Sequence, residues 1–187
     1  DSNFPDETFS ANGRFSKRIK KIQFRASGSL ALSTSNNRIN NEIRESQSFT
    51  QNYSTSVRTS FRDWPNFEVG YRVNINEYDN GGLEQTFFTQ RPFANFDARF
   101  LKDFTFNAEW DFYDYTNDSK TIENRYSFVN ANLFYQQKDS NWEFQLQANN
   151  VLDTAFINND SFSDQFNTTT QYFVLPRIMM VVVKYDL

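Results

Sequence analysis

Apolar and polar residues alternate almost without interruption in the stretch FEVGYRVNINEY, residues 67–78. One set of alternate positions holds Phe67, Val69, Tyr71, Val73 and Ile75, and the other holds Glu68, Arg72, Asn74 and Asn76. Successive side chains of a β-strand point to opposite faces of the sheet. The stretch therefore predicts a strand with one apolar face and one polar, charged face.

The same alternation recurs along the chain and predicts eight strands. They cover residues 21–35, 48–61, 67–78, 86–100, 103–115, 126–137, 141–149 and 172–187. Pro92 interrupts the fourth and indicates a bulge or a ladder defect there. Strands of soluble proteins typically have about 5–6 residues. Several of these segments are long enough to cross a bilayer at a tilt and to project beyond it.

Short and long connections alternate between these segments. The short ones, at 62–66, 101–103 and 138–141, carry Pro, Asp, Asn and Ser, which favour tight turns. Between them we predict long polar links at 36–45, 76–85, 116–124 and 152–171. Outer-membrane barrels place short turns at one end and long loops at the other. The pattern therefore predicts an all-β, antiparallel up-and-down transmembrane β-barrel.

Composition supports a membrane-facing wall over a soluble core. Aromatic residues make up 18% of the chain, although the mean hydropathy is −0.73. A lipid-facing barrel wall needs an apolar residue only at every second position. Aromatic residues also lie beside the predicted turns, among them Phe61, Trp64, Phe100 and Trp142, as in an interfacial girdle. We expect the apolar face to contact lipid in a bacterial outer membrane.

The residue inventory excludes several functions. The chain has no Cys and no His, which removes thiol and imidazole catalysis and most zinc chemistry. The net charge is −4, so the basic surface of a nucleic-acid-binding protein is not expected. We expect no enzymatic activity, no cofactor and no metal. No apolar run is long enough for a membrane-spanning helix.

The last fifty residues resemble a known family. The stretch NWEFQLQANNVLDTAF (141–156) resembles the penultimate strand and the following Asn-Leu-Phe/Leu-Asp box of TonB-dependent receptors. The stretch YFVLPRIMMVVVKYDL (172–187) resembles their final strand, especially in the Bacteroidetes branch. DWPNFEVGYRVNINEY (63–78) and SKRIKKIQFRASGSLALS (16–33) are similar to other strands of that branch.

This resemblance implies that residues 1–187 form one domain, the C-terminal part of a 22-strand barrel whose plug and TonB box are not in this stretch. Residues 1–16 would then be the end of a preceding external loop and strand. The implied function is import of a siderophore, glycan or peptide. The implied partners are membrane lipid, the rest of the barrel, the plug, TonB through that plug, and a surface lipoprotein. Tyr185 and Leu187 would form the assembly signal, with Leu187 where the family usually has Phe.

Twelve polar residues share the predicted inner face. They are Arg25, Arg58, Glu68, Arg72, Asn74, Glu109, Asp111, Asn130, Asn132, Glu143, Gln145 and Gln147. These side chains could line a substrate route, but a solvated lumen wall with paired charges is the simpler interpretation. Glu109 and Asp111 lie two apart, as a carboxylate pair would, but nothing else in the sequence identifies a hydrolase site.

Two alternative architectures remain open at this point. An eight-stranded barrel that closes on itself would act as an anchor or scaffold, and its first and last strands would pair. A soluble β-sandwich, acting as a binding module, would instead bury the Phe-rich face between two sheets. The pairing of the edge strands and the burial of that face distinguish the three architectures.

Overall fold

A computed structural model describes residues 6–39, 42–63, 65–82, 84–162 and 167–186. Within these ranges the chain is all-β. The strands are β1 (Glu7–Ile19), β2 (Ile22–Ile39), β3 (Glu42–Thr59), β4 (Asn66–Asp79), β5 (Glu84–Phe100), β6 (Phe104–Asn117), β7 (Glu123–Tyr135), β8 (Trp142–Asn149), β9 (Phe156–Phe162), β10 (Asn167–Phe173) and β11 (Ile178–Tyr185).

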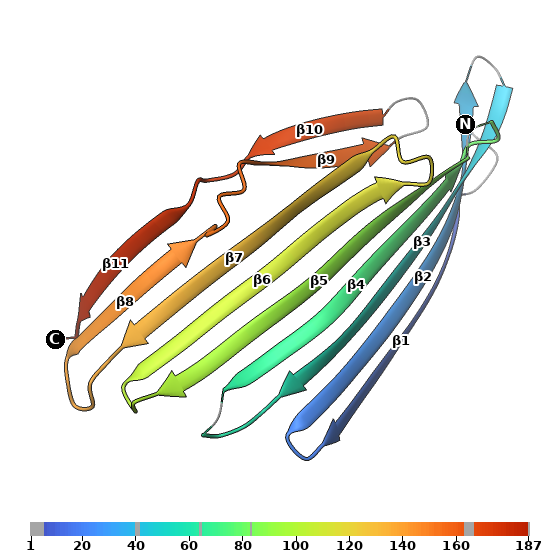
Figure 1. Ribbon diagram of the computed structural model, residues 1–187. Coiled ribbons are helices and arrows are strands. Elements are labelled where there is room, and N and C mark those ends of the chain that lie inside the picture. Colours follow the sequence, from blue (N-terminus) through green and yellow to red (C-terminus); the bar gives the residue numbers. More distant parts are fainter. Residues whose placement is uncertain (1–5, 40–41, 64, 83, 163–166, 187) are drawn as a thin grey trace.

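Nine of these strands form one antiparallel sheet in the order β1-β2-β3-β4-β5-β6-β7-β8-β11 (Figure 1). Consecutive strands are neighbours throughout, except where the separate hairpin of β9 and β10 is inserted between β8 and β11. The prediction of an all-β, antiparallel up-and-down fold is confirmed. The sheet is open, because β1 and β11 form its two edges and do not pair with each other in the described part of the chain.

The prediction of eight strands is wrong, because three strands were missed. β1 overlaps residues 1–16, which only the family resemblance assigned to the end of a preceding loop and strand. Its alternate positions hold small residues such as Ala11 and Gly13, which weaken the hydrophobic signal. β9 lies within the predicted link 152–171, and β10 begins in that link and ends two residues beyond it, at Phe173. That link is mostly polar, so hydrophobic periodicity could not reveal a hairpin held by backbone hydrogen bonds.

Strands also extend into the other three predicted long links. β2 and β3 leave only residues 40–41 between them, β4 and β5 leave 80–83, and β6 and β7 leave 118–122. In these extensions polar residues occupy both faces, so apolar alternation stops while the backbone ladder continues. Hydrophobic periodicity therefore marks the apolar part of each strand and not its end.

The tight turns lie together at one end of the sheet. The β1–β2, β3–β4, β5–β6 and β7–β8 connections share the lower edge in Figure 1. Leu101 and Lys102 adopt positive φ angles in the β5–β6 turn. In the β3–β4 turn the Asn66 amide accepts a hydrogen bond from the Phe61 N–H at 2.5 Å and donates one to the Phe61 carbonyl at 3.0 Å. The predicted turn chemistry is thus present.

Pro92 lies at a local break between two strands. The β5–β6 register runs from Phe87 opposite Asn117 to Gln90 opposite Asp114, and resumes only at Phe93 opposite Asp111. Since proline has no backbone N–H to donate, an interruption at this position is expected. The predicted ladder defect is confirmed.

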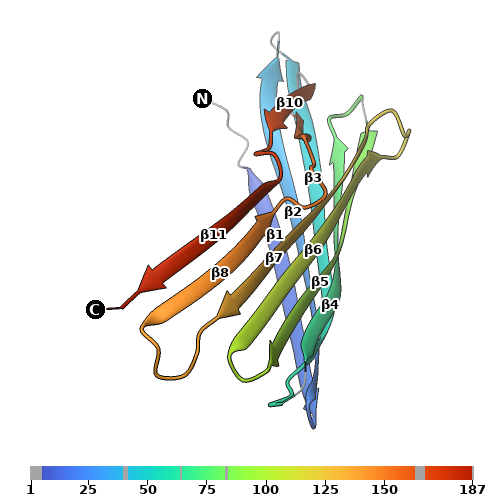
Figure 2. The ribbon, with the colours of Figure 1, turned by 60° about the vertical axis from the view of Figure 1, so that its left-hand side comes forward.

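The two faces of the sheet differ sharply. Facing residues in antiparallel strands share one side, so the register extends the apolar face of Phe67, Val69 and Tyr71 across all nine strands. We call this side the apolar face and the side of Glu68 and Arg72 the polar face. Figures 1 and 2 show one curved layer, with the β9–β10 hairpin at the end opposite the tight turns. A second sheet covering the Phe-rich face, as in a sandwich, is not found in the described residues.

Candidate functional site: the polar face

All twelve polar residues predicted to share a face do so. Arg58 faces Glu68, Glu109 faces Asn130, and the other eight follow by the same register. Their exposure to a lumen stays a prediction. Tyr185 lies on the opposite, apolar face beside Trp142, and Leu187 lies outside the described residues.

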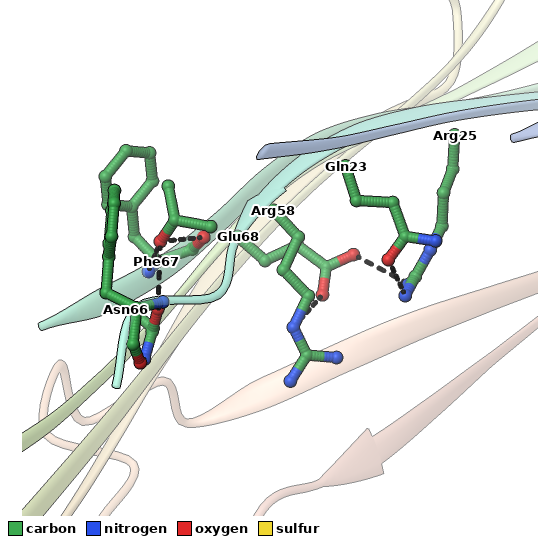
Figure 3. Close-up of polar contacts among 8 residues, drawn as sticks. Gln23, Arg25, Arg58, Asn66, Phe67 and Glu68 are labelled. Atoms are coloured by element: carbon green, nitrogen blue, oxygen red, sulfur yellow. Dashed lines mark hydrogen bonds and ion pairs between the residues drawn. The ribbon is translucent and has the colours of Figure 1, made fainter. Parts of the chain in front are cut away.

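One ion-pair cluster joins β2, β3 and β4 near the tight turns (Figure 3). Glu68 lies between two arginines, 3.5 Å from Arg25 Nη1 and 4.0 Å from Arg58 Nε. Arg25 also donates a hydrogen bond to Gln23 at 3.0 Å. The Glu68 side chain is only 17% exposed. This cluster ties neighbouring strands together and leaves its carboxylate largely covered.

A second cluster lies further from the turns. Arg72 Nη1 and Arg91 Nη2 approach the same Asp111 oxygen, at 4.0 and 3.8 Å. Both contacts are at the outer limit of an ion pair, and all three side chains are more than 40% exposed. Arg72 and Asp111 were predicted, but Arg91 was not. It precedes Pro92, where the interrupted alternation concealed its face.

A glycine creates the platform beneath Arg72. Gly70 in β4 faces Phe93 in β5, and a Cβ at position 70 would lie 2.4 Å from the Phe93 ring and 2.7 Å from the Thr55 carbonyl oxygen. Without that Cβ the ring lies close against the sheet and is buried. The Arg72 guanidinium carbon lies 4.0 Å from the centre of the ring, a cation–π contact.

Aromatic rings also support Arg91. Its guanidinium carbon lies 5.8 Å from the centre of the Tyr113 ring. Tyr113 stacks on Tyr126 of β7, with ring centres 4.5 Å apart and planes 13° apart. Aromatic rings on β5, β6 and β7 therefore support both arginines beside the Asp111 carboxylate.

These side chains border a hollow of about 910 Å³ on the polar face, which we call the arginine hollow. Arg14, Arg72 and Arg91 line it together with Tyr113. Amides and hydroxyls complete the lining: Asn12, Ser27, Ser29, Asn52, Asn74 and Thr89. Asn74 donates to Asn52 at 2.8 Å, and Asn52 donates to Ser29 at 3.3 Å, so a hydrogen-bonded line crosses β4, β3 and β2.

None of the predicted residues of β6, β7 and β8 lines this hollow, although Asp111 contacts two arginines that do. Glu143 accepts from Lys184 at 2.9 Å, and Gln145 donates to Asn132 at 3.4 Å. Asn130 accepts from the backbone N–H of Asn150 at 3.0 Å. Glu109 and Gln147 share this face without lining the hollow. The twelve residues thus share a face but not one site.

Sequence reasoning missed the aromatic residues on the polar face. They are Tyr78, Phe87, Phe93, Tyr113, Tyr115, Tyr126, Phe128 and Phe134. Phe87, Phe93 and Tyr115 are also the buried hydrophobic residues of the described chain. Aromatic doublets could have revealed them, because adjacent residues of a strand point to opposite faces. The doublets Phe87-Phe88 and Phe112-Tyr113 each place one ring on each face.

A row of aromatic rings borders the apolar face beside the tight turns. Neighbouring ring centres lie 4.7–6.4 Å apart along Phe100, Phe104, Tyr135, Phe144, Trp142 and Tyr185, from β5 to β11. We call this set the aromatic row. Aromatic rings with a polar tip favour the boundary between hydrocarbon and water.

Polar residues border the apolar face at its other end. Gln51, Glu77, Gln90, Asp114 and Arg125 occupy apolar-face positions there. The Tyr53 hydroxyl donates to Gln51 at 2.9 Å, and the Tyr71 hydroxyl donates to Gln90. Arg125 Nε donates to Asp114 at 3.2 Å. The apolar face is therefore a band with an aromatic border and a polar border.

Asn150 organises the junction between the sheet and the β9–β10 hairpin. Its buried side chain donates to the carbonyls of Thr154 and Leu175 at 2.9 and 3.0 Å and accepts from the Thr154 N–H at 2.9 Å. Asp153 accepts from the Arg177 N–H at 2.9 Å. The Asn-Val-Leu-Asp stretch thus fixes the entry to and the exit from the hairpin.

In the described residues, no group of three or more His, Cys, Asp or Glu side chains is arranged to hold a metal ion. The same residues contain no helix that could span a membrane. No family model matches the chain, and neither curated proteins nor solved structures include a significant match.

Proposed function

We propose that this chain forms part of the wall of an outer-membrane β-barrel transporter of the TonB-dependent type. The uncovered apolar face is the observation that carries the proposal. Val181 is 72% exposed and Leu146 is 49% exposed, and large apolar side chains are exposed on every strand of the nine-stranded sheet except β7. Water is an unfavourable medium for an apolar patch of this extent, whereas lipid is a favourable one.

The dimensions and borders of the apolar band support a membrane setting. Its apolar stretches, such as Phe67–Ile75 in β4 and Phe104–Phe112 in β6, have about the 9–11 residues that a tilted strand needs to cross a bilayer. The aromatic row and the opposite polar border lie where the two lipid–water interfaces would be.

The open edges favour a barrel with more strands over a closed eight-stranded one. An unpaired strand edge in lipid leaves backbone N–H and C=O groups without partners, which costs several kcal/mol for each group. We propose that β1 and β11 pair with further strands of a larger barrel. The resemblance of residues 141–187 to TonB-dependent receptors supports a 22-strand barrel with a plug and energised import of a nutrient.

In this proposal the polar face lines a water-filled lumen and contacts the plug. The exposed ion pairs and amide chains suit that setting, because lumen walls are polar and solvated. The strand extensions and the β9–β10 hairpin project to the external side. A surface lipoprotein and TonB, the latter through the plug, are the proposed protein partners.

Site-specific labels on neighbouring residues of β7 test the orientation. The chain contains no Cys, so Ala131→Cys on the apolar face and Asn132→Cys on the polar face each create a single attachment point within it. Both variants are made in the protein encoded by the complete gene, labelled with the same fluorophore and placed in vesicles. We expect lipid-attached quenchers to act on the label at 131, and aqueous iodide to act on the label at 132.

Equal quenching of both labels by iodide would rule out lipid contact at the apolar face. The import part of the proposal has its own test in the coding sequence upstream of Asp1. A plug domain and a TonB box are expected there. Their absence from the complete gene would leave a barrel without energised import.

A further inference from the structure

The arginine hollow contains more positive charge than its surroundings compensate. Arg14, Arg72 and Arg91 line it, and Asp111 is the carboxylate shared by the last two. Among the residues that the structure describes, none of these three guanidinium groups donates a hydrogen bond, and Arg14 has no ion-pair partner. Guanidinium groups bind carboxylate and phosphate strongly, through two parallel N–H donors.

The hollow also holds two of these arginines in place before any ligand arrives. Gly70 lets the Phe93 ring lie flat, and that ring supports Arg72 at 4.0 Å. Tyr113, stacked on Tyr126, supports Arg91. Their side chains are nevertheless 46% and 44% exposed, so the N–H donors remain available. Positioning a donor in advance reduces the entropy that a ligand must remove.

The Glu68 cluster, on the same face, is an example of an ion-pair cluster that only joins strands. There the carboxylate is mostly covered, Arg25 already donates to Gln23, and the hollow that Glu68 lines has a volume of about 440 Å³. The Asp111 side chain is 41% exposed, and the hollow lined by its two arginines measures about 910 Å³, within the usual range for small-molecule sites.

We infer that the arginine hollow binds an acidic saccharide, with the sugar carboxylate held by Arg72 and Arg91. The amides and hydroxyls of Asn52, Asn74 and Ser29 suit sugar hydroxyl groups, because both donate and accept hydrogen bonds. The Tyr113 ring offers an apolar edge for the sugar C–H groups. This inference rests on the proposed function, in which the polar face is wet, and it names the substrate class.

Calorimetric titration tests the inference on the protein from the complete gene in detergent micelles. The probes are a linear galacturonic acid trimer, the matched neutral galactose trimer and inorganic phosphate. We expect the acidic trimer to bind at least about tenfold more tightly than the neutral trimer, since a hydrogen bond to a charged group is worth that factor. We also expect it to bind more tightly than phosphate, which lacks the sugar hydroxyl groups that the amides would contact. We expect Arg72→Gln with Arg91→Gln to remove that advantage. Arg99→Gln, on the polar face outside the hollow, is the matched control and should leave binding unchanged.

Three results would overturn the inference: equal binding of the neutral trimer, equal binding of phosphate, or unchanged affinity in the folded double variant. If circular dichroism shows that the double variant does not fold, Arg91→Gln alone decides, because it removes one of the two proposed carboxylate donors and only one ion-pair contact at 3.8 Å. Unchanged affinity in that variant would also overturn it. The β7 labels separate the two proposals, since they report on lipid contact and not on binding.

Discussion

Several aromatic residues are exposed on the apolar face of this sheet, whereas several are buried on its polar face. On the apolar face Phe67, Trp142 and Phe144 are exposed, as are most large side chains around them. On the polar face Phe87, Phe93 and Tyr115 are buried, although their neighbours are arginines, amides and carboxylates. In a soluble protein such exposed rings would usually gather in a core, and the proposed contact with lipid on one face and water on the other would account for the inversion.

On the polar face, aromatic rings pack against the sheet and against each other. Phe93 fills the space above Gly70, and Tyr113 and Tyr126 stack across two strands. Phe93 and Tyr113 each support a guanidinium group. The aromatic residues of the apolar face instead form a row along one border, where the band meets the turns. The same residue types therefore build a support on one face and a border on the other.

The largest effect is expected from a charge placed on each face of β8. Leu146→Arg puts a guanidinium on the apolar face, and Gln145→Arg puts one on the polar face. In lipid the first should reduce the free energy of unfolding by about 2–4 kcal/mol, and the second should change it little. Urea unfolding in vesicles measures both. Similar small changes in the two variants would contradict the assignment of the faces.

Gly70 tests whether the polar face is closely packed. Gly70→Ala places a Cβ against Phe93 and the Thr55 carbonyl, so a backbone shift is required and a loss of about 1–3 kcal/mol is expected. Gly13→Ala is the matched control, since no atom lies within 4 Å of its Cβ position. The midpoints of thermal unfolding of the two variants are compared. Equal midpoints would show that the Phe93 ring can adopt another position without a loss of stability.

The aromatic row gives a smaller effect. Tyr135 lies 4.7 Å from Phe104 and 6.2 Å from Phe144, measured between ring centres. Tyr135→Leu keeps an apolar side chain but loses both ring contacts and the polar tip, so about 1 kcal/mol of stability should be lost. Leu133→Ile, one position along the same face, is a control that changes no ring. Chemical unfolding in vesicles should separate the two.

The smallest effect is expected at Glu68. Glu68→Gln removes the charge between Arg25 and Arg58, whose side chains are about half exposed. Solvent screens such pairs, so the change in the free energy of unfolding should stay below about 1 kcal/mol. The same urea titration measures it. A loss as large as that of Leu146→Arg would mean that the polar face is not solvated.

Some features of the chain were readable from residue order alone. The alternation in 67–78 and its repeats predicted the two faces, and all twelve polar residues from Arg25 to Gln147 do share one of them. Period-two side-chain geometry is local, so a single strand suffices to reveal it. The turn residues around Asn66 and the ladder break at Pro92 could also be predicted, because turn preferences and the missing N–H of proline are local properties.

Strand ends and the site itself needed tertiary structure. β2, β3 and the β9–β10 hairpin extend through polar sequence, where only backbone pairing between segments defines a strand. The arginine hollow depends on residues from different strands: Gly70 beneath Phe93, Arg91 above Tyr113, and Asp111 between two arginines. Residue order determined which side chains share a face. The register across the sheet decided which of them meet, because contacts between strands depend on how each strand is aligned with its neighbour.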